Sequence, residues 1–149
     1  MTKSTSNTQA QDTGMMLALT YKILFLSTAV TIYLANMLSP GSVVLGTMSL
    51  TPLWAVVLSS GVVSLIATLV LPFLNRFERQ RDNELSPAEM MAFYFAINFV
   101  SLWLITRASD VFGLGLSSWL VTLVLALIVN LIQGVAMVAT LKLRQRVSL

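Results

Sequence analysis

The stretch PLWAVVLSSGVVSLIATLVLPFL, residues 52–74, contains no charged side chain and decides the fold class. A bilayer core requires about 20 apolar helical residues, so this stretch is long enough to cross one. Thr51 supplies a capping hydroxyl, and Pro52 suits the first position of a helix. The sequence therefore predicts a membrane-spanning helix here, which Pro72 either kinks or ends.

Three further stretches are similarly long and mostly apolar, with Lys22 and Glu89 near the start of two of them. They cover about residues 17–38, 87–106 and 118–141. Ser86, Pro87 and Glu89 form the pattern of a capping box in front of the third stretch. Together the four stretches predict an all-α polytopic membrane protein with a four-transmembrane-helix bundle at residues 14–141. Residues 1–13 are predicted to be a disordered cytoplasmic segment, and residues 142–149 a basic cytoplasmic tail.

The composition narrows the chemistry available to the chain. It is 56% hydrophobic and 10% charged, whereas soluble domains carry about a quarter charged residues. It has neither cysteine nor histidine, which excludes thiol chemistry and removes the commonest general base and metal ligand. No acidic residue falls in the centre of a predicted span. We therefore expect no cofactor, no metal and no enzymatic activity. No nucleic-acid partner is expected, because no basic face with interleaved aromatic residues occurs.

The positions of the cationic residues predict the orientation. Eight of the nine lysines and arginines fall on one side of the predicted spans: Lys3, Lys22, Arg76, Arg79, Arg81, Lys142, Arg144 and Arg146. Arg107 alone falls on the other side, where we expect it to form a local ion pair or a helix cap with Asp110. The positive-inside rule then places both termini in the cytoplasm of a plasma (inner) membrane protein. We expect Arg76, Arg79, Arg81, Lys142, Arg144 and Arg146 to contact lipid headgroups.

Two features allow more than one interpretation. The first span has lysines and an apolar stretch, like a signal peptide, but no clear cleavage site follows it, so a retained span is favoured. Asn98, Asn130 and Gln133 are the most polar side chains near the span centres. Interhelical hydrogen bonding is the favoured role for them, and lining of a solute path is the alternative.

Small residues also recur every four positions on three spans. They are Ser27, Thr31 and Ala35, then Ser60, Ser64 and Thr68, and finally Ala126, Asn130 and Gly134. Such stripes allow helix backbones to approach closely, either inside one bundle or between copies of the chain. The first outer loop, residues 39–51, is unusually apolar. We expect it to pack on the bundle, dip into the interface or meet a partner.

The two halves of the chain resemble each other. Each has a helix, a glycine-containing outer turn, a tryptophan (Trp54 or Trp119) and a second helix. A duplication would produce two hairpins that point the same way. The alternative is that any two apolar hairpins look alike.

Four elements carry a resemblance to a known family. They are Pro40-Gly41, the run Val62–Ile66 leading to Pro72, Ile97-Asn98 followed by Leu102-Trp103-Leu104, and Val129-Asn130-Leu131. Over about residues 32–133 the chain resembles the YvlD-like small four-span bacterial membrane proteins, also called mycobacteriophage holin superfamily IV. The resemblance implies the architecture more than an activity.

The function hypothesis is a small non-enzymatic integral membrane protein that acts through protein or lipid contacts. A scaffold, a stress-related protein or an accessory subunit would fit. Its expected partners are the lipid bilayer and either a second copy of the chain or another membrane protein. The alternative is a holin-like or channel-like pore formed by oligomerisation.

Overall fold

The computed structural model describes the backbone of residues 3–81 and 85–147, and the side chains of residues 14–74, 76, 77, 80 and 85–140. Four long helices account for most of it: α1 (Lys3–Leu38), α2 (Pro52–Arg81), α3 (Pro87–Arg107) and α5 (Trp119–Val147). Their segments long and apolar enough to cross a membrane are Gly14–Leu38, Pro52–Leu74, Pro87–Arg107 and Trp119–Thr140. The predicted all-α, four-helix membrane fold is confirmed.

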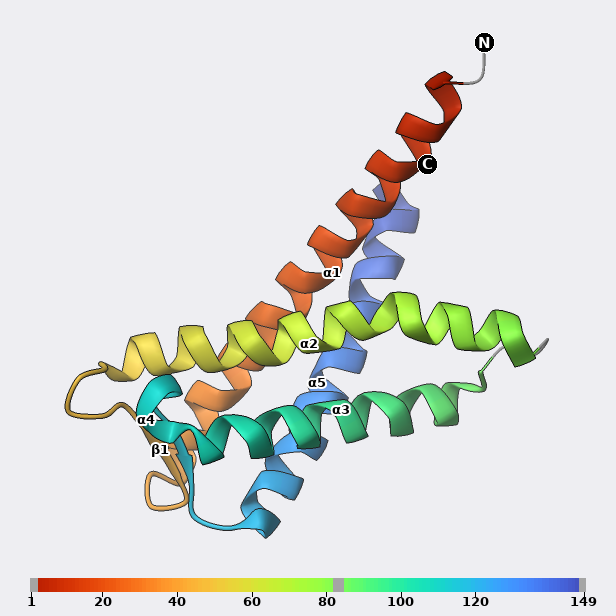
Figure 1. The fold of residues 1–149 in the computed structure, drawn as a ribbon. Coiled ribbons are helices and arrows are strands. Elements are labelled where there is room, and N and C mark those ends of the chain that lie inside the picture. Colours follow the sequence, from red (N-terminus) through yellow and green to blue (C-terminus); the bar gives the residue numbers. More distant parts are fainter. Residues whose placement is uncertain (1–2, 82–84, 148–149) are drawn as a thin grey trace.

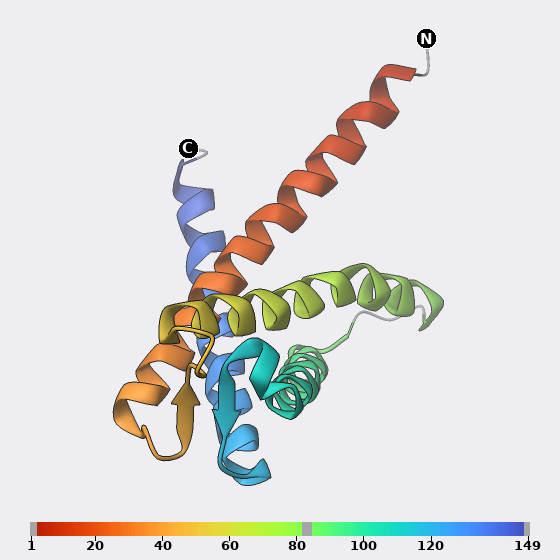
Figure 2. The ribbon, with the colours of Figure 1, turned by 60° about the vertical axis from the view of Figure 1, so that its left-hand side comes forward.

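The four helices pack in a ring, because α1 contacts α2 and α5, and α3 contacts the same two helices. At one end, which we call the sheet end, all four helices meet a small β-sheet (Figures 1 and 2). Away from it, α1 and α5 run toward the two termini while α2 and α3 run together in another direction (Figure 1). The two helix pairs therefore diverge with distance from the sheet end.

The distribution of side chains is the reverse of that in a soluble bundle. Large apolar side chains are exposed along all four spans, among them Leu26, Val30, Leu65, Leu69, Val100, Val124 and Val135. Polar side chains are buried between the helices instead, including Ser60, Asn98 and Gln133. Water would disfavour so much exposed apolar surface, whereas lipid tails accommodate it. With four spanning helices, this identifies a multi-pass membrane protein.

The β-sheet joins the two loops at the sheet end, and the sequence did not predict it. Strand β1 (Val43–Leu45) pairs antiparallel with β2 (Leu114–Leu116), with Val44 opposite Gly115 (Figure 2). The ladder continues where the Gly46 backbone N–H donates to the Gly113 carbonyl at 2.8 Å. The side chains of Val43 in β1 and Leu114 in β2 are buried. The apolar loop 39–51 thus packs on the bundle, one of the expected arrangements.

Three helix boundaries differ from the expectations and one short helix is additional; α5 continues past residue 141 to Val147. Helix α1 already begins at Lys3, where disorder is predicted; adding residues to an existing helix is easier than nucleating one. Helix α2 continues through Pro72 to Arg81, so this proline does not end it. A short helix, α4 (Ser109–Phe112), precedes β2 in the second half of the chain. Because the first half has no counterpart of α4 between its long helices, the duplication stays a prediction.

The start of α3 follows the predicted capping box. The Glu89 backbone N–H donates to the Ser86 hydroxyl, and the Ser86 N–H donates to the Glu89 carboxylate at 2.9 Å. Replacing Ser86 with alanine is expected to lower the free energy of unfolding by about 1 kcal/mol. Denaturation in mixed detergent micelles measures this change. Ser117→Ala is the control, because the exposed Ser117 side chain caps no helix; an equal loss in both variants would contradict the prediction.

Candidate functional site

The three polar residues singled out in the sequence all lie inside the bundle. Asn98 is fully buried, and Gln133 and Asn130 are almost so. The Asn98 amide donates to Gln133 Oε1 at 2.9 Å, and Gln133 Nε2 donates to the Thr28 hydroxyl at 2.8 Å. Thr28 in turn donates to the Leu24 carbonyl one turn earlier in α1. This chain of hydrogen bonds, which we call the polar network, joins α3, α5 and α1.

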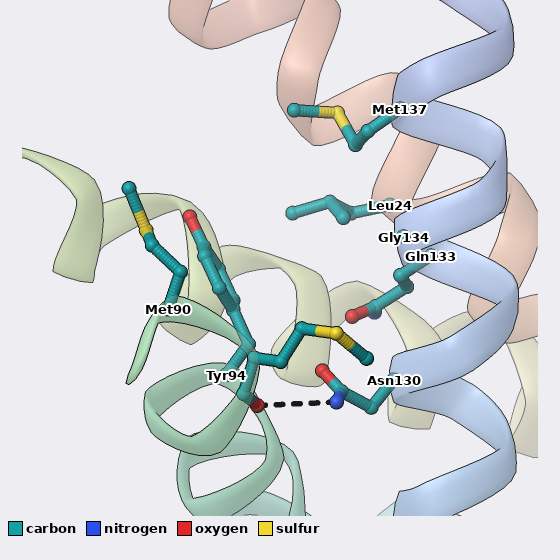
Figure 3. Close-up of a pocket in the computed structure, with 8 residues that line it drawn as sticks. Leu24, Met90, Tyr94, Asn130, Gln133, Gly134 and Met137 are labelled. Carbon is teal, nitrogen blue, oxygen red and sulfur yellow. Dashed lines mark hydrogen bonds between the residues drawn. The ribbon is translucent and has the colours of Figure 1, made fainter. Parts of the chain in front are cut away.

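Asn130 lies one turn away from Gln133 on α5 and bonds separately. Its side-chain nitrogen donates to the Met91 carbonyl of α3 at 3.2 Å (Figure 3). The predicted interhelical hydrogen bonding of Asn98, Asn130 and Gln133 is thus present for all three. None of these bonds involves α2, since they connect only α1, α3 and α5.

Further buried hydroxyl groups lie on α1 and α2, and most of them bond to their own helix. Thr31, Ser60 and Thr68 each donate to the carbonyl four residues earlier. Three buried atoms lack a hydrogen-bond partner among the described residues: Ser64 Oγ, Asn98 Oδ1 and Ser101 Oγ. Leaving such an atom unsatisfied costs about 1–3 kcal/mol, and buried waters usually prevent that cost. A single water molecule within hydrogen-bond reach of Ser64 Oγ, Asn98 Oδ1 or Ser101 Oγ would remove that cost.

Apolar side chains separate the polar network from the sheet end. Ile32, Leu102 and Val129 are fully buried in the core cluster. Closer to the sheet the same cluster continues through Val43, Val56, Ile105, Leu114 and Leu125. The strands and the helix ends thus close one end of the bundle with a mainly apolar layer, in which the buried Ser59 hydroxyl donates to the Phe112 carbonyl.

A cavity of about 170 Å³ lies between α1, α3 and α5, on the side where the helix pairs diverge. Its lining consists of Leu24, Met90, Met91, Tyr94, Asn130, Gln133, Gly134 and Met137. Figure 3 shows Met90 and Tyr94 on α3 facing Gly134 and Met137 on α5 across this space. The cavity is apolar except for Asn130 and Gln133 on the α5 side and the hydroxyl of Tyr94 on the α3 side.

The basic residues predicted to touch lipid headgroups are described only in part. Arg76 is exposed near the end of α2, as a headgroup contact requires. Arg79, Arg81, Lys142, Arg144 and Arg146 lie outside the described side chains. Arg107 is placed differently from the expectation: its guanidinium lies 5.0 Å from the centre of the Trp103 ring, and it forms no ion pair with Asp110 among the described residues. Cation–π attraction to the Trp103 ring stabilises the Arg107 guanidinium instead.

The three tryptophans gather at the sheet end. Trp54, Trp103 and Trp119 are all exposed near the sheet-end termini of their helices. Indole rings favour this position at a membrane–water interface, since one edge is apolar and the N–H remains hydrated.

Thr28, which also belongs to the polar network, is harder to recognise from the sequence. Thr28 is next to the stripe of Ser27 and Thr31 in sequence, but it lies on the buried face of α1 with Leu24 and Ile32. These three residues recur every four positions, and this spacing is the sequence signal that indicates the burial of Thr28. The described residues contain no cluster of three or more acidic, cysteine or histidine side chains able to hold a metal ion. The arrangement therefore offers hydrogen bonds, an uncharged cavity and apolar surface.

Comparison with protein-family models, with curated proteins and with solved structures finds no match for this chain.

Proposed function

We propose that this is a non-enzymatic integral membrane protein that acts through contacts with lipids or with other membrane proteins. The observation that supports this most directly is that Asn98, Asn130 and Gln133 all form hydrogen bonds within a single chain. Side chains that are buried and hydrogen-bonded inside the bundle are not available to line a channel between copies. The surface left for contacts is apolar and suits lipid tails or other transmembrane helices.

The second candidate is a holin-like or channel-like pore formed by oligomerisation. It is favoured by the three unpartnered atoms Ser64 Oγ, Asn98 Oδ1 and Ser101 Oγ, which water in a channel would satisfy. The mainly apolar layer at the sheet end argues against it, because moving an ion into apolar surroundings has a large desolvation cost.

The proposal also includes the orientation of the protein in the membrane and its bacterial origin. Both termini would lie in the cytoplasm of a bacterium, with the sheet end outside, as the excess of cationic residues favours. The relationship to the YvlD-like family remains part of this proposal and rests on the sequence motifs alone.

Release of trapped dye from liposomes distinguishes the two candidates. The purified protein is reconstituted, insertion is verified by flotation and protease protection, and release of a small anionic dye and of potassium is followed. We expect no release above that of protein-free vesicles. Protein-dependent release that grows steeply with protein density would contradict the proposal and favour the pore. Vesicles with a pore-forming peptide serve as the positive control.

A further inference from the structure

We propose that the cavity between α1, α3 and α5 binds the head of an uncharged lipid that carries a hydroxyl group, such as a long-chain alcohol. This rests on the proposed function, in which the protein acts through lipid contacts, and it names a class of lipid and a site. The site is defined by Asn130 and Gln133 on one side and by Leu24, Met90 and Met137 on the others.

The polarity of the lining selects the head group. No lining side chain carries a formal charge, so neither a carboxylate nor an ammonium would find a counter-ion there. Asn130 Nδ2 already donates to the Met91 carbonyl, and both polar ends of Gln133 are used by Asn98 and Thr28. Asn130 Oδ1 points into the cavity and has no donor among the described residues (Figure 3). A hydroxyl group would supply that donor.

The opposite wall offers a second partner. The Tyr94 hydroxyl forms no hydrogen bond with the described residues and lies near the rim, beside Met90 (Figure 3). A phenol both donates and accepts, so it offers a partner to a ligand hydroxyl at the rim, and Asn130 offers one deeper in the cavity. A pure hydrocarbon would leave both polar groups without partners, which disfavours it.

The size and shape indicate that only part of the lipid enters. A cavity of about 170 Å³ resembles the engineered cavity of about 150 Å³ that holds one benzene molecule. It therefore accommodates a head and the first few carbons of a chain. The methionines Met90, Met91 and Met137 suit this apolar portion, because their flexible thioethers adapt to different shapes. The rest of the chain would pass between the diverging helices into the bilayer.

Gly134 allows the site to be blocked without disturbing the bundle. Gly134 lines the cavity, and a Cβ at this position would meet no heavy atom within 4 Å, so a larger side chain has room to extend over the cavity without displacing a neighbour. The Gly134→Leu variant fills the cavity and also replaces glycine with a better helix former. Gly14→Leu is the matched control, because Gly14 has equally open surroundings on α1 but does not line the cavity.

The test is photolabelling in liposomes with a hexadecanol that carries a diazirine beside its hydroxyl end, followed by mapping of the labelled peptides. We expect labelling around Met90–Tyr94 and Gln133–Met137 that excess unlabelled hexadecanol suppresses. Labelling should fall about tenfold or more in Gly134→Leu and stay unchanged in Gly14→Leu. Asn130→Leu, which removes the acceptor, should reduce alcohol labelling while a diazirine-bearing alkane labels as before.

Labelling spread evenly over the lipid-facing helices, or unchanged in Gly134→Leu, would overturn the proposal. So would equally strong competition by hexadecanoic acid, which carries a charge. Dye retention is measured in the same vesicles. If they stay tight while labelling fails, the lipid site alone is refuted. If they leak, the proposed function fails regardless of the labelling.

Discussion

Replacing Gly113 with alanine is expected to lower the free energy of unfolding by roughly 2–4 kcal/mol. Gly113 has a φ of 72°, in the left-handed region that residues with a Cβ adopt at a cost. An added Cβ would also lie 2.7 Å from the Ala55 Cβ and 3.7 Å from the Gly46 Cα. Relief of this clash must separate α2 from the loop and weaken the Gly46–Gly113 backbone hydrogen bond.

Equilibrium denaturation by sodium dodecyl sulfate in mixed micelles, followed by tryptophan fluorescence, measures the effect. Gly115→Ala is the control, because its Cβ would lie an ordinary 3.8 Å from the Val44 Cβ and its φ is not in the left-handed region. We expect a change below about 1 kcal/mol in that variant. Equal stabilities of the two variants would mean that the sheet end does not pack as described.

The second large effect is expected for Gln133→Leu, roughly 1–3 kcal/mol of lost stability. Leucine has a similar volume but accepts no hydrogen bond, so the Asn98 amide loses its acceptor while its Oδ1 already lacks a donor. Thr28 is affected less, because its hydroxyl keeps its bond to the Leu24 carbonyl. Most of the lost stability therefore comes from the Asn98 side chain, which is left buried without a hydrogen-bond partner.

A double-mutant cycle tests that explanation. Replacing both partners of a buried hydrogen bond with apolar groups is much less costly than replacing one. The Asn98→Leu, Gln133→Leu double variant is therefore expected to be more stable than the sum of the single losses predicts. Denaturation in mixed micelles provides the four free energies. Strictly additive losses would show that Asn98 and Gln133 do not depend on each other.

The sequence was sufficient to predict the four membrane-spanning helices, although not α4 or the full lengths of α1, α2 and α5. Charge-free stretches such as residues 52–74 predict spans directly, since hydrocarbon leaves few alternatives to a helix. The capping box at Ser86 and Glu89 marks the start of α3 to the residue, because both hydrogen bonds are local. The burial of Asn98 and Gln133 also follows from the cost of exposing amides to lipid.

Features that join distant segments could not be predicted in this way. Pairing of Val43–Leu45 with Leu114–Leu116 depends on how the helices bring the two loops together, and three-residue strands have no periodicity of their own. The contact of Gly113 with Ala55 depends on the same placement. The cavity arises because the helix pairs diverge, and the divergence of packed helices is a property of tertiary structure that composition does not encode.

The central claim, that Asn98, Asn130 and Gln133 form hydrogen bonds inside a single bundle that is closed at its sheet end, is tested most directly by thiol accessibility. The chain has no native cysteine, so single cysteines at Asn98, Asn130 and Gln133 report without background. A sulfonated maleimide is applied to both faces of intact proteoliposomes. The exposed loop position Met48→Cys serves as the positive control, and detergent denaturation shows that each thiol can react.

We predict complete reaction at position 48 and none at positions 98, 130 and 133 until the bundle is denatured. Reaction at any of these three positions in intact vesicles would contradict the claim, because it would place a water-filled path beside the polar network.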